Sequence, residues 1–88
     1  MPVVSQFYGI IIRMFHNDNE KHHIPHIHAM YGEYNVSFDL EGNIIKGDFP
    51  KKQTKIVTAW IIIHKYELEL LWKSIHQDNV FFTIEPLK

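Results

Sequence analysis

The sequence predicts an α+β fold, in which a four-stranded, mainly antiparallel β-meander packs one face on a long C-terminal helix. Two observations favour this fold. Apolar and polar residues alternate over 34–40, which indicates a half-buried strand, and from about Pro50 apolar residues recur at helical spacing. With 88 residues, the chain is expected to form one domain, 1–88, around a single core.

The four predicted strands occupy the first half of the chain. Residues 7–15 are rich in β-branched and aromatic side chains, which is typical of a long first strand. The polar segment 16–25 ends in proline and is expected to be a surface loop, after which a second strand begins at His26. Residues 34–40 form the third strand, and 44–48 a short fourth one after a glycine-containing turn.

One helix is predicted for the second half of the chain. Its apolar stripe comprises Val57, Trp60, Ile61, His64, Leu68, Leu71, Trp72 and Ile75. This stripe is expected to cover the apolar face of the sheet, with both tryptophans as core anchors and His64 as a core histidine. Residues 81–84 are predicted to form a last short strand or an extended tail.

A predicted two-residue hairpin sets the register between the second and third strands. Gly32 at the first central position suits a type II′ turn with Tyr31 opposite Tyr34. The apolar face then pairs Ala29 with Val36 and Ile27 with Phe38, and the polar face pairs His28 with Ser37 and His26 with Asp39. This register therefore predicts a carboxylate directly across from an imidazole.

Composition excludes several classes of protein. The net charge of −1 gives no overall basic field for nonspecific nucleic-acid binding, so local patches must carry any such role. Without cysteine, a metal site has to use histidines and carboxylates. The N-terminus lacks a signal peptide pattern and the apolar run 56–63 is too short to cross a bilayer, so a cytoplasmic protein without membrane contact is expected.

Four of the seven histidines lie within residues 22–28. Histidine has an unperturbed pKa near neutrality and its neutral ring binds metals, so the cluster points to proton transfer or metal ligation. His26 and His28 project from the same side of a strand. With a third ligand from the loop, such as His23, they would hold a divalent metal such as zinc, whereas a solvated polar face with no cofactor is the alternative.

A second interpretation of the same cluster requires no metal. His26 and His28 would act as acid and base on RNA, as in a ribonuclease-like hydrolase, with Asp39 orienting His26. Arg13, the only arginine, is expected on the same polar face and would contact the phosphate. These four residues are the predicted catalytic set.

Lysines supply a third candidate site, which is composed of Lys46, Lys51, Lys52 and Lys55. Three of them lie near the predicted helix start, where the helix dipole disfavours positive charge. Helix N-termini and lysines both attract phosphate, so this patch is predicted to bind an anion, a nucleic-acid backbone or a partner protein. A freely solvated lysine run explains the pattern equally well.

The chain also resembles a known bacterial family. The resemblance rests on Met1-Pro2, Tyr8-Gly9-Ile10, Pro25-His26-Ile27-His28-Ala29, Tyr31-Gly32-Glu33, Gly47-Asp48-Phe49-Pro50 and the spacing of Trp60, His64 and Trp72. In these motifs the sequence is similar to the domain of unknown function 4160 family. The resemblance implies a compact cytoplasmic prokaryotic domain, with a second small protein encoded nearby in an arrangement like that of toxin–antitoxin pairs.

Three functional hypotheses stay open from the sequence. The chain is a ribonuclease-like toxin component, a noncatalytic module that docks a small protein partner, or a histidine-based metal-binding domain. A homodimer is also expected if the apolar stripe is wider than one sheet face can bury.

Overall fold

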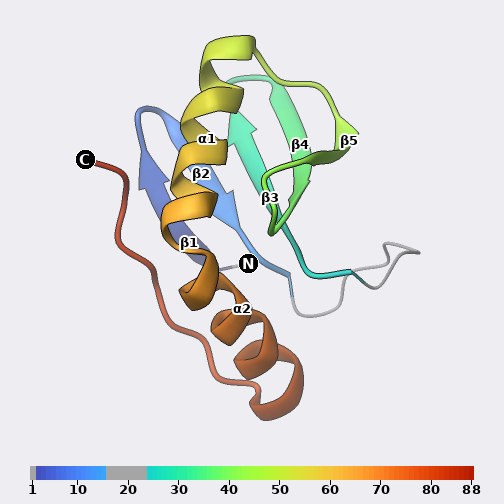
Figure 1. Cartoon of the computed structure of the whole chain (residues 1–88), viewed down its shortest axis with the longest axis vertical. Helices are drawn as coiled ribbons and strands as arrows, with labels where there is room; N and C mark the ends of the chain where they lie inside the picture. The colour runs from blue at the N-terminus through green and yellow to red at the C-terminus, as the bar shows by residue number, and fades with distance from the viewer. Residues whose placement is uncertain (1, 16–23) are drawn as a thin grey trace.

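The structure is a computed structural model that describes residues 2–15 and 24–88. Five antiparallel strands form one sheet in the order of the chain: β1 (Val3–Phe7), β2 (Ile10–Arg13), β3 (His26–Tyr31), β4 (Tyr34–Asp39) and β5 (Ile44–Gly47). The helices are α1 (Lys51–Ile63) and α2 (Lys65–Lys73), followed by a π-helical turn, η1 (Ser74–Asp78). The helices lie along one face of the sheet (Figure 1), which confirms the α+β class.

The prediction of a single first strand over 7–15 is wrong. Tyr8 and Gly9 have φ angles of 50° and 76°, and they form a two-residue turn between the paired residues Phe7 and Ile10. Two consecutive positive φ angles are typical of a type I′ hairpin, which reverses the chain. The sheet therefore has five strands in the described part of the chain rather than the predicted four, and its first strand begins at Val3.

The prediction of one long helix is also wrong in detail, because the helix is interrupted at His64. Its φ of −108° and ψ of 21° lie outside the helical region, so α1 ends before it and α2 begins after it. The backbone amide of His64 still donates to Trp60, and Leu68 donates to His64. These bonds keep α1 and α2 in line, so most of the predicted stripe is buried. His64 is only partly buried and pairs with Glu67 instead of lying in the core, and Trp72 is also partly buried.

The register of the β3–β4 hairpin is confirmed along its whole length. Tyr31 lies opposite Tyr34, and Gly32 has a φ of 57° as a type II′ turn requires. The pairs that follow are Ala29 with Val36, His28 with Ser37, Ile27 with Phe38, and His26 with Asp39. Ile27, Ala29, Val36 and Phe38 all lie in the apolar core between the sheet and the helices.

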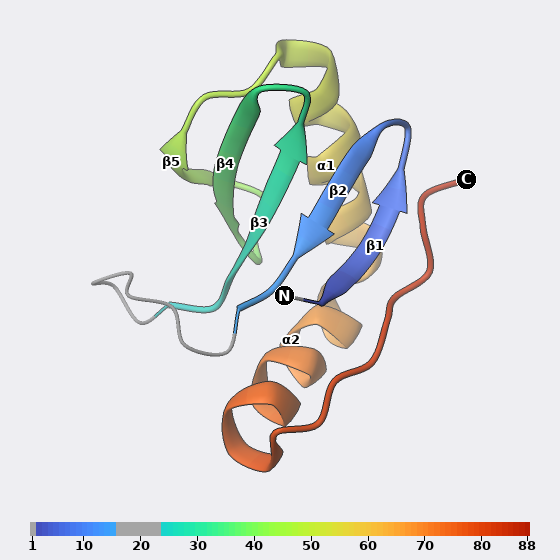
Figure 2. The ribbon, with the colours of Figure 1, turned by 180° about the vertical axis from the view of Figure 1, so that it is seen from behind.

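The C-terminal segment is an extended tail rather than a strand. It runs beside β1 (Figure 2), where the amide of Ile84 donates to the carbonyl oxygen of Val4 at 2.9 Å. The indole N–H of the fully buried Trp60 donates to the carbonyl of Glu85, also at 2.9 Å. The tail therefore closes the end of the core next to β1 and satisfies the polar atom of its largest side chain.

Gly47 is expected to be the most sensitive glycine. Its φ is 96°, and a Cβ there would lie 2.5 Å from the carbonyl oxygen of Asn35 on the neighbouring strand. Gly47→Ala should lower the free energy of unfolding by about 3 kcal/mol, because left-handed strain and a backbone clash act together. Urea denaturation measures this change.

Gly32→Ala is the matched control. Gly32 also has positive φ, but a Cβ there would meet nothing within 4 Å, so only the backbone strain of about 1–2 kcal/mol applies. Equal losses in the two variants would contradict the close approach of β4 and β5 at Gly47.

Candidate functional site

The face of the sheet turned away from α1, here called the outer face, carries a row of polar side chains. Figure 2 shows this face in front of the helices. Arg13 of β2 lies opposite His28 of β3, His28 lies opposite Ser37 of β4, and Ser37 lies opposite Lys46 of β5. Residues that face one another across an antiparallel ladder project from the same side of the sheet. Four neighbouring strands therefore contribute a guanidinium, an imidazole, a hydroxyl and an ammonium group to one row.

The place of Lys46 corrects one expectation. If residues 44–48 continued the hairpin pairing regularly, Lys46 would be expected beside Asp39, but the structure pairs it with Ser37. The pairing of β4 with β5 shifts between Ser37 and Phe38, as at a β-bulge. This irregularity displaces the side chains of β5 along the ladder. Lys46 thereby joins the row that contains His28.

His28 is the central member of the row. Its Nδ1 atom lies 3.4 Å from the hydroxyl oxygen of Ser37, a long hydrogen bond, and its ring makes an edge-on contact with Phe15 at a centroid distance of 4.4 Å. The ring is only partly buried. The hydrogen bond to Ser37 and the contact with Phe15 together restrict the orientation of this ring.

His26 is buried, although the sequence placed it on an exposed polar face. Only 4% of the residue is accessible, because its ring packs at 5.3 Å from the rings of both His28 and Trp72. Its Nδ1–H donates to the carbonyl oxygen of Ile24 at 2.7 Å. Helix α2 extends past the end of the sheet (Figure 2), which is how Trp72 reaches a histidine of the outer face.

Asp39 lies opposite His26 in the ladder, as predicted, but its carboxylate has other partners. One oxygen accepts the backbone N–H groups of Glu41 and Asn43 at 2.9 Å each, and the other accepts the side-chain amide of Asn43 at 3.3 Å. The carboxylate thus closes the turn between β4 and β5. In this arrangement the Ile24 carbonyl, and not Asp39, orients the imidazole of His26.

The two histidines belong to a continuous series of ring contacts. The series runs through Phe15, His28, His26, Trp72 and His76, with successive centroid distances of 4.4, 5.3, 5.3 and 4.1 Å. The Nδ1–H of His76 also donates to the carbonyl oxygen of Trp72 at 2.9 Å. Five rings therefore join the outer face of the sheet to the C-terminal end of the helices.

Sequence reasoning missed three of these five rings as part of the site. Two signals were present: Phe15 alternates in phase with Arg13, and Trp72 and His76 are four residues apart, so they share one side of a helix. Assigning Trp72 to the core alone hid its contact with His26. The structure shows that this indole packs both against the core and on His26.

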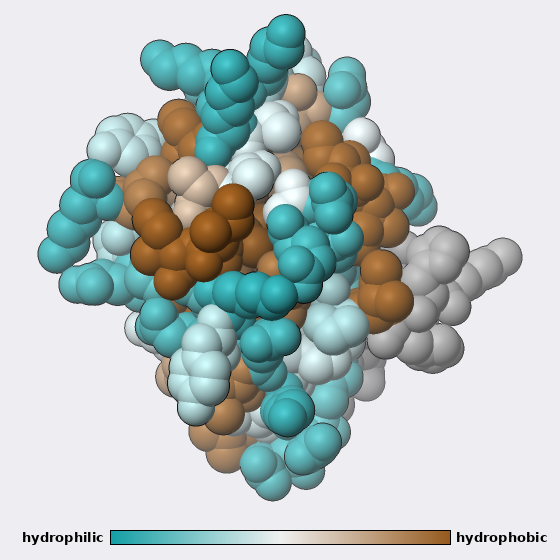
Figure 3. All heavy atoms as spheres, in the orientation of Figure 1, coloured by the Kyte–Doolittle hydropathy of each residue, from teal (hydrophilic) through white to brown (hydrophobic). Residues whose placement is uncertain are grey.

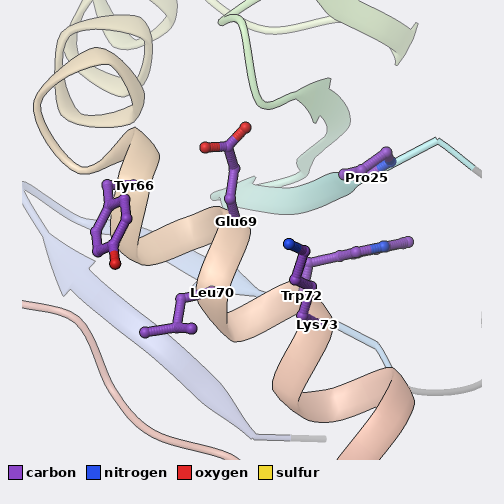
Figure 4. A pocket seen from close by; sticks show the side chains of 6 residues that line it. All are labelled: Pro25, Tyr66, Glu69, Leu70, Trp72 and Lys73. Atoms are coloured by element: carbon purple, nitrogen blue, oxygen red, sulfur yellow. The ribbon is translucent and has the colours of Figure 1, made fainter.

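A half-open pocket of about 310 Å³ lies beside Trp72. It is lined by Pro25, Tyr66, Glu69, Leu70, Trp72 and Lys73. In Figure 4 the indole extends from α2 on the side of the helix nearer to Pro25, whereas Tyr66 and Leu70 project on the other side. The pocket therefore adjoins the ring series at one end and an apolar helix face at the other.

The remaining predicted site residues are not brought together with the row. Lys51, Lys52 and Lys55 are exposed in the first turns of α1, on a different element from Lys46. His23, the predicted third metal ligand, lies outside the described residues. Within residues 2–15 and 24–88, no three His, Asp or Glu side chains are grouped closely enough to hold a metal ion.

Comparisons with known proteins assign a family and no activity. The sequence matches the family described as domain of unknown function DUF4160 over residues 9–73, which contain the polar row and both histidines. No curated protein matches, and no solved structure does. In the part of the chain that the structure describes, none of the helices has the length and apolar character to cross a membrane.

Removing the buried ring of His26 should lower the stability of the fold. His26→Ala is expected to lower the free energy of unfolding by about 2 kcal/mol, since it leaves a cavity against Trp72 and an unpaired Ile24 carbonyl. His28→Ala, at a partly exposed ring, should cost less than about 1 kcal/mol. Thermal and urea unfolding measure both, and equal costs would contradict the buried position of His26.

Proposed function

The chain belongs to the DUF4160 family of domains of unknown function, and we propose that it binds single-stranded RNA in the cytoplasm through the outer face of its sheet. The observation that carries this proposal is the row formed by Arg13, His28, Ser37 and Lys46 on four adjacent strands. The row combines the two permanent cations with the partly buried imidazole of His28, whereas Ser37 is only 5% accessible and its hydroxyl supports the His28 ring. These are the groups that contact phosphate and sugar oxygens of nucleic acids.

The positions of the two cations in the row favour an RNA strand whose phosphate backbone runs across the β-strands. Arg13 and Lys46 lie three strands apart in the row, with His28 and Ser37 between them. Neighbouring strands are spaced by about 4.8 Å, so the two cations lie roughly 14 Å apart along the row. An extended single strand would place two phosphates, separated by one further phosphate, near the two ends of such a row.

The rings support contacts with bases. Sequence-tolerant binding of single strands uses aromatic, histidine or arginine planes on which bases stack. Phe15 packs on His28 of the row, and the ring series continues from His28 through His26 to Trp72 and His76. A net charge of −1 means that such binding depends on this local arrangement and not on an overall basic field.

RNA cleavage is the second candidate, favoured by the contact between two imidazoles next to an arginine. In this form His28 takes the proton of a ribose 2′-hydroxyl, which attacks the adjacent phosphorus, and His26 protonates the departing 5′ oxygen. Arg13 stabilises the charge that develops on the phosphorane. Because His26 is buried, its role in this form requires that the substrate reach it past His28. A small protein encoded nearby would then serve as a regulator, as in toxin–antitoxin pairs.

Lys46→Gln tests whether RNA binds at the outer face of the sheet or at the lysines of α1. Affinity for a short single-stranded RNA, measured by fluorescence anisotropy, should fall roughly three- to tenfold, and the salt dependence should lose about 0.7 in slope for one phosphate contact. Lys52→Gln is the matched control, because it removes the same charge from an exposed position in α1. A loss of affinity in Lys52→Gln alone would place binding on the helix start and overturn the proposal.

The cleavage form has its own test. Incubation of the purified protein with a labelled RNA in the presence of a chelator should yield products with a 2′,3′-cyclic phosphate, and His28→Gln should abolish them. RNA that is bound but never cut would leave binding as the function and remove the catalytic roles of His26 and His28.

A further inference from the structure

The pocket beside Trp72 adjoins the surface proposed to bind RNA. Trp72 lines the pocket, and its ring packs at 5.3 Å from that of His26, which lies at the same distance from the ring of His28 in the polar row. Two ring contacts therefore separate the pocket from the row. A strand that lies along the row can reach the pocket with a neighbouring base.

The size and the lining of the pocket suit a single nucleobase. Its volume of about 310 Å³ lies at the lower end of the roughly 300–1,000 Å³ that is typical of ligand pockets, which favours one base over a longer segment. In Figure 4, Glu69 and Lys73 lie between Tyr66 on one side and Pro25 with the Trp72 indole on the other. Bases of single-stranded RNA are recognised by stacking on aromatic planes and by hydrogen bonds to their Watson–Crick edges, and this lining offers both.

Glu69 and Lys73 are the charged groups of the pocket, and they lie one helical turn apart on α2. Both are exposed, and Figure 3 shows hydrophilic side chains next to apolar ones on the surface over the helices. Among the described residues, neither takes part in an ion pair. Lys65, one turn before Glu69, is held by Glu41; the hydrogen bond between them raises the pKa of Lys65, and the charge of Glu69 adds to that rise. The carboxylate of Glu69 and the ammonium group of Lys73 are therefore open to a ligand.

We propose that this pocket binds a guanine base of the RNA, an inference that rests on the proposed RNA binding and gives it a base preference. A carboxylate accepts two parallel hydrogen bonds, whereas an ammonium group only donates. On its Watson–Crick edge, guanine presents two adjacent donors, N1–H and the 2-amino group, next to the acceptor O6. Glu69 accepts from the two donors, Lys73 donates to O6, and the base packs on the part of Trp72 that lines the pocket.

The other bases do not match this pattern of groups. Adenine and cytosine each present an amino donor beside a ring nitrogen that accepts, and uracil presents one donor between two carbonyl oxygens. Each of them sets an acceptor against an oxygen of Glu69, which is unfavourable because both groups carry lone pairs and no proton. The pocket therefore favours guanine.

Three RNAs of one length test the base preference: an oligouridylate, and the same strand with a single guanosine or inosine at its centre. Inosine lacks the 2-amino group, so it loses one of the two hydrogen bonds to Glu69. By fluorescence anisotropy, the guanosine strand should bind about tenfold tighter than the oligouridylate, with the inosine strand between them, because hydrogen bonds to a charged group are the stronger ones. In Glu69→Gln the preference should largely disappear, since an amide has only one acceptor oxygen.

Glu33→Gln is the matched control for the base preference. It removes the same charge from an exposed residue in the turn between β3 and β4, and it should keep the preference for guanosine. The ratio of two affinities is the quantity compared, so a general gain in RNA affinity from the lost negative charge cancels. Equal affinity for all three strands would overturn the guanine pocket and leave RNA binding at the row in place. Binding of none of them would overturn the proposed function, and the guanine pocket with it.

Free guanosine monophosphate distinguishes a base of the strand from a free nucleotide. It should bind at least about tenfold more weakly than the guanosine strand, because it lacks the contacts with the row. In a titration followed by nuclear magnetic resonance it should shift the indole N–H signal of Trp72. The indole N–H of Trp60, which is buried and donates to the carbonyl of Glu85, should stay in place. A nucleotide that binds as tightly as the strand, or one that leaves the Trp72 signal unmoved, would overturn the proposal.

Discussion

The register of the β3–β4 hairpin is the constraint on which the rest of the structure depends. Side chains alternate along a strand with period two, so a slip of one residue would move Ile27 and Phe38 to the outer face and His26 and His28 into the core. Burial of the apolar set and the glycine at the turn exclude that slip. One hairpin thereby determines which residues pack under the helix and which form the polar row.

The two faces of the sheet are connected at one end, where Trp72 packs both on the core and on His26. This contact removes His26 from solvent and leaves His28 as the accessible imidazole of the pair. It also makes the position of α2 important for the site, because a movement of that helix would uncover His26. The Glu41 carboxylate, in the turn after β4, holds Lys65 at the start of α2 and raises the pKa of that ammonium by the hydrogen bond between them.

Local patterns in the sequence predicted the central part of the fold, and long-range geometry explains the rest. The alternation over 34–40 and Gly32 predicted the hairpin correctly, because both signals act within a few residues. Tyr8-Gly9 was read as strand, since the surrounding β-branched residues masked a two-residue turn. The position of Lys46 depended on an irregular pairing, and the burial of His26 on a helix that begins almost 40 residues later, so neither was visible in a local pattern.

The claim that the outer face is the functional surface is tested most directly by mapping chemical shifts of the isotope-labelled protein during titration with a short single-stranded RNA. The account predicts that the amide signals of Arg13, His28, Ser37 and Lys46 move together and saturate at one stoichiometry. Signals of Ile62, Ile63, Tyr66 and Leu70, on the exposed side of the helices, should stay in place when the RNA lacks guanine. The account would be contradicted if only the signals of Lys51, Lys52 and Lys55 moved. It would also be contradicted if signals of the helices moved while those of Arg13, His28, Ser37 and Lys46 did not.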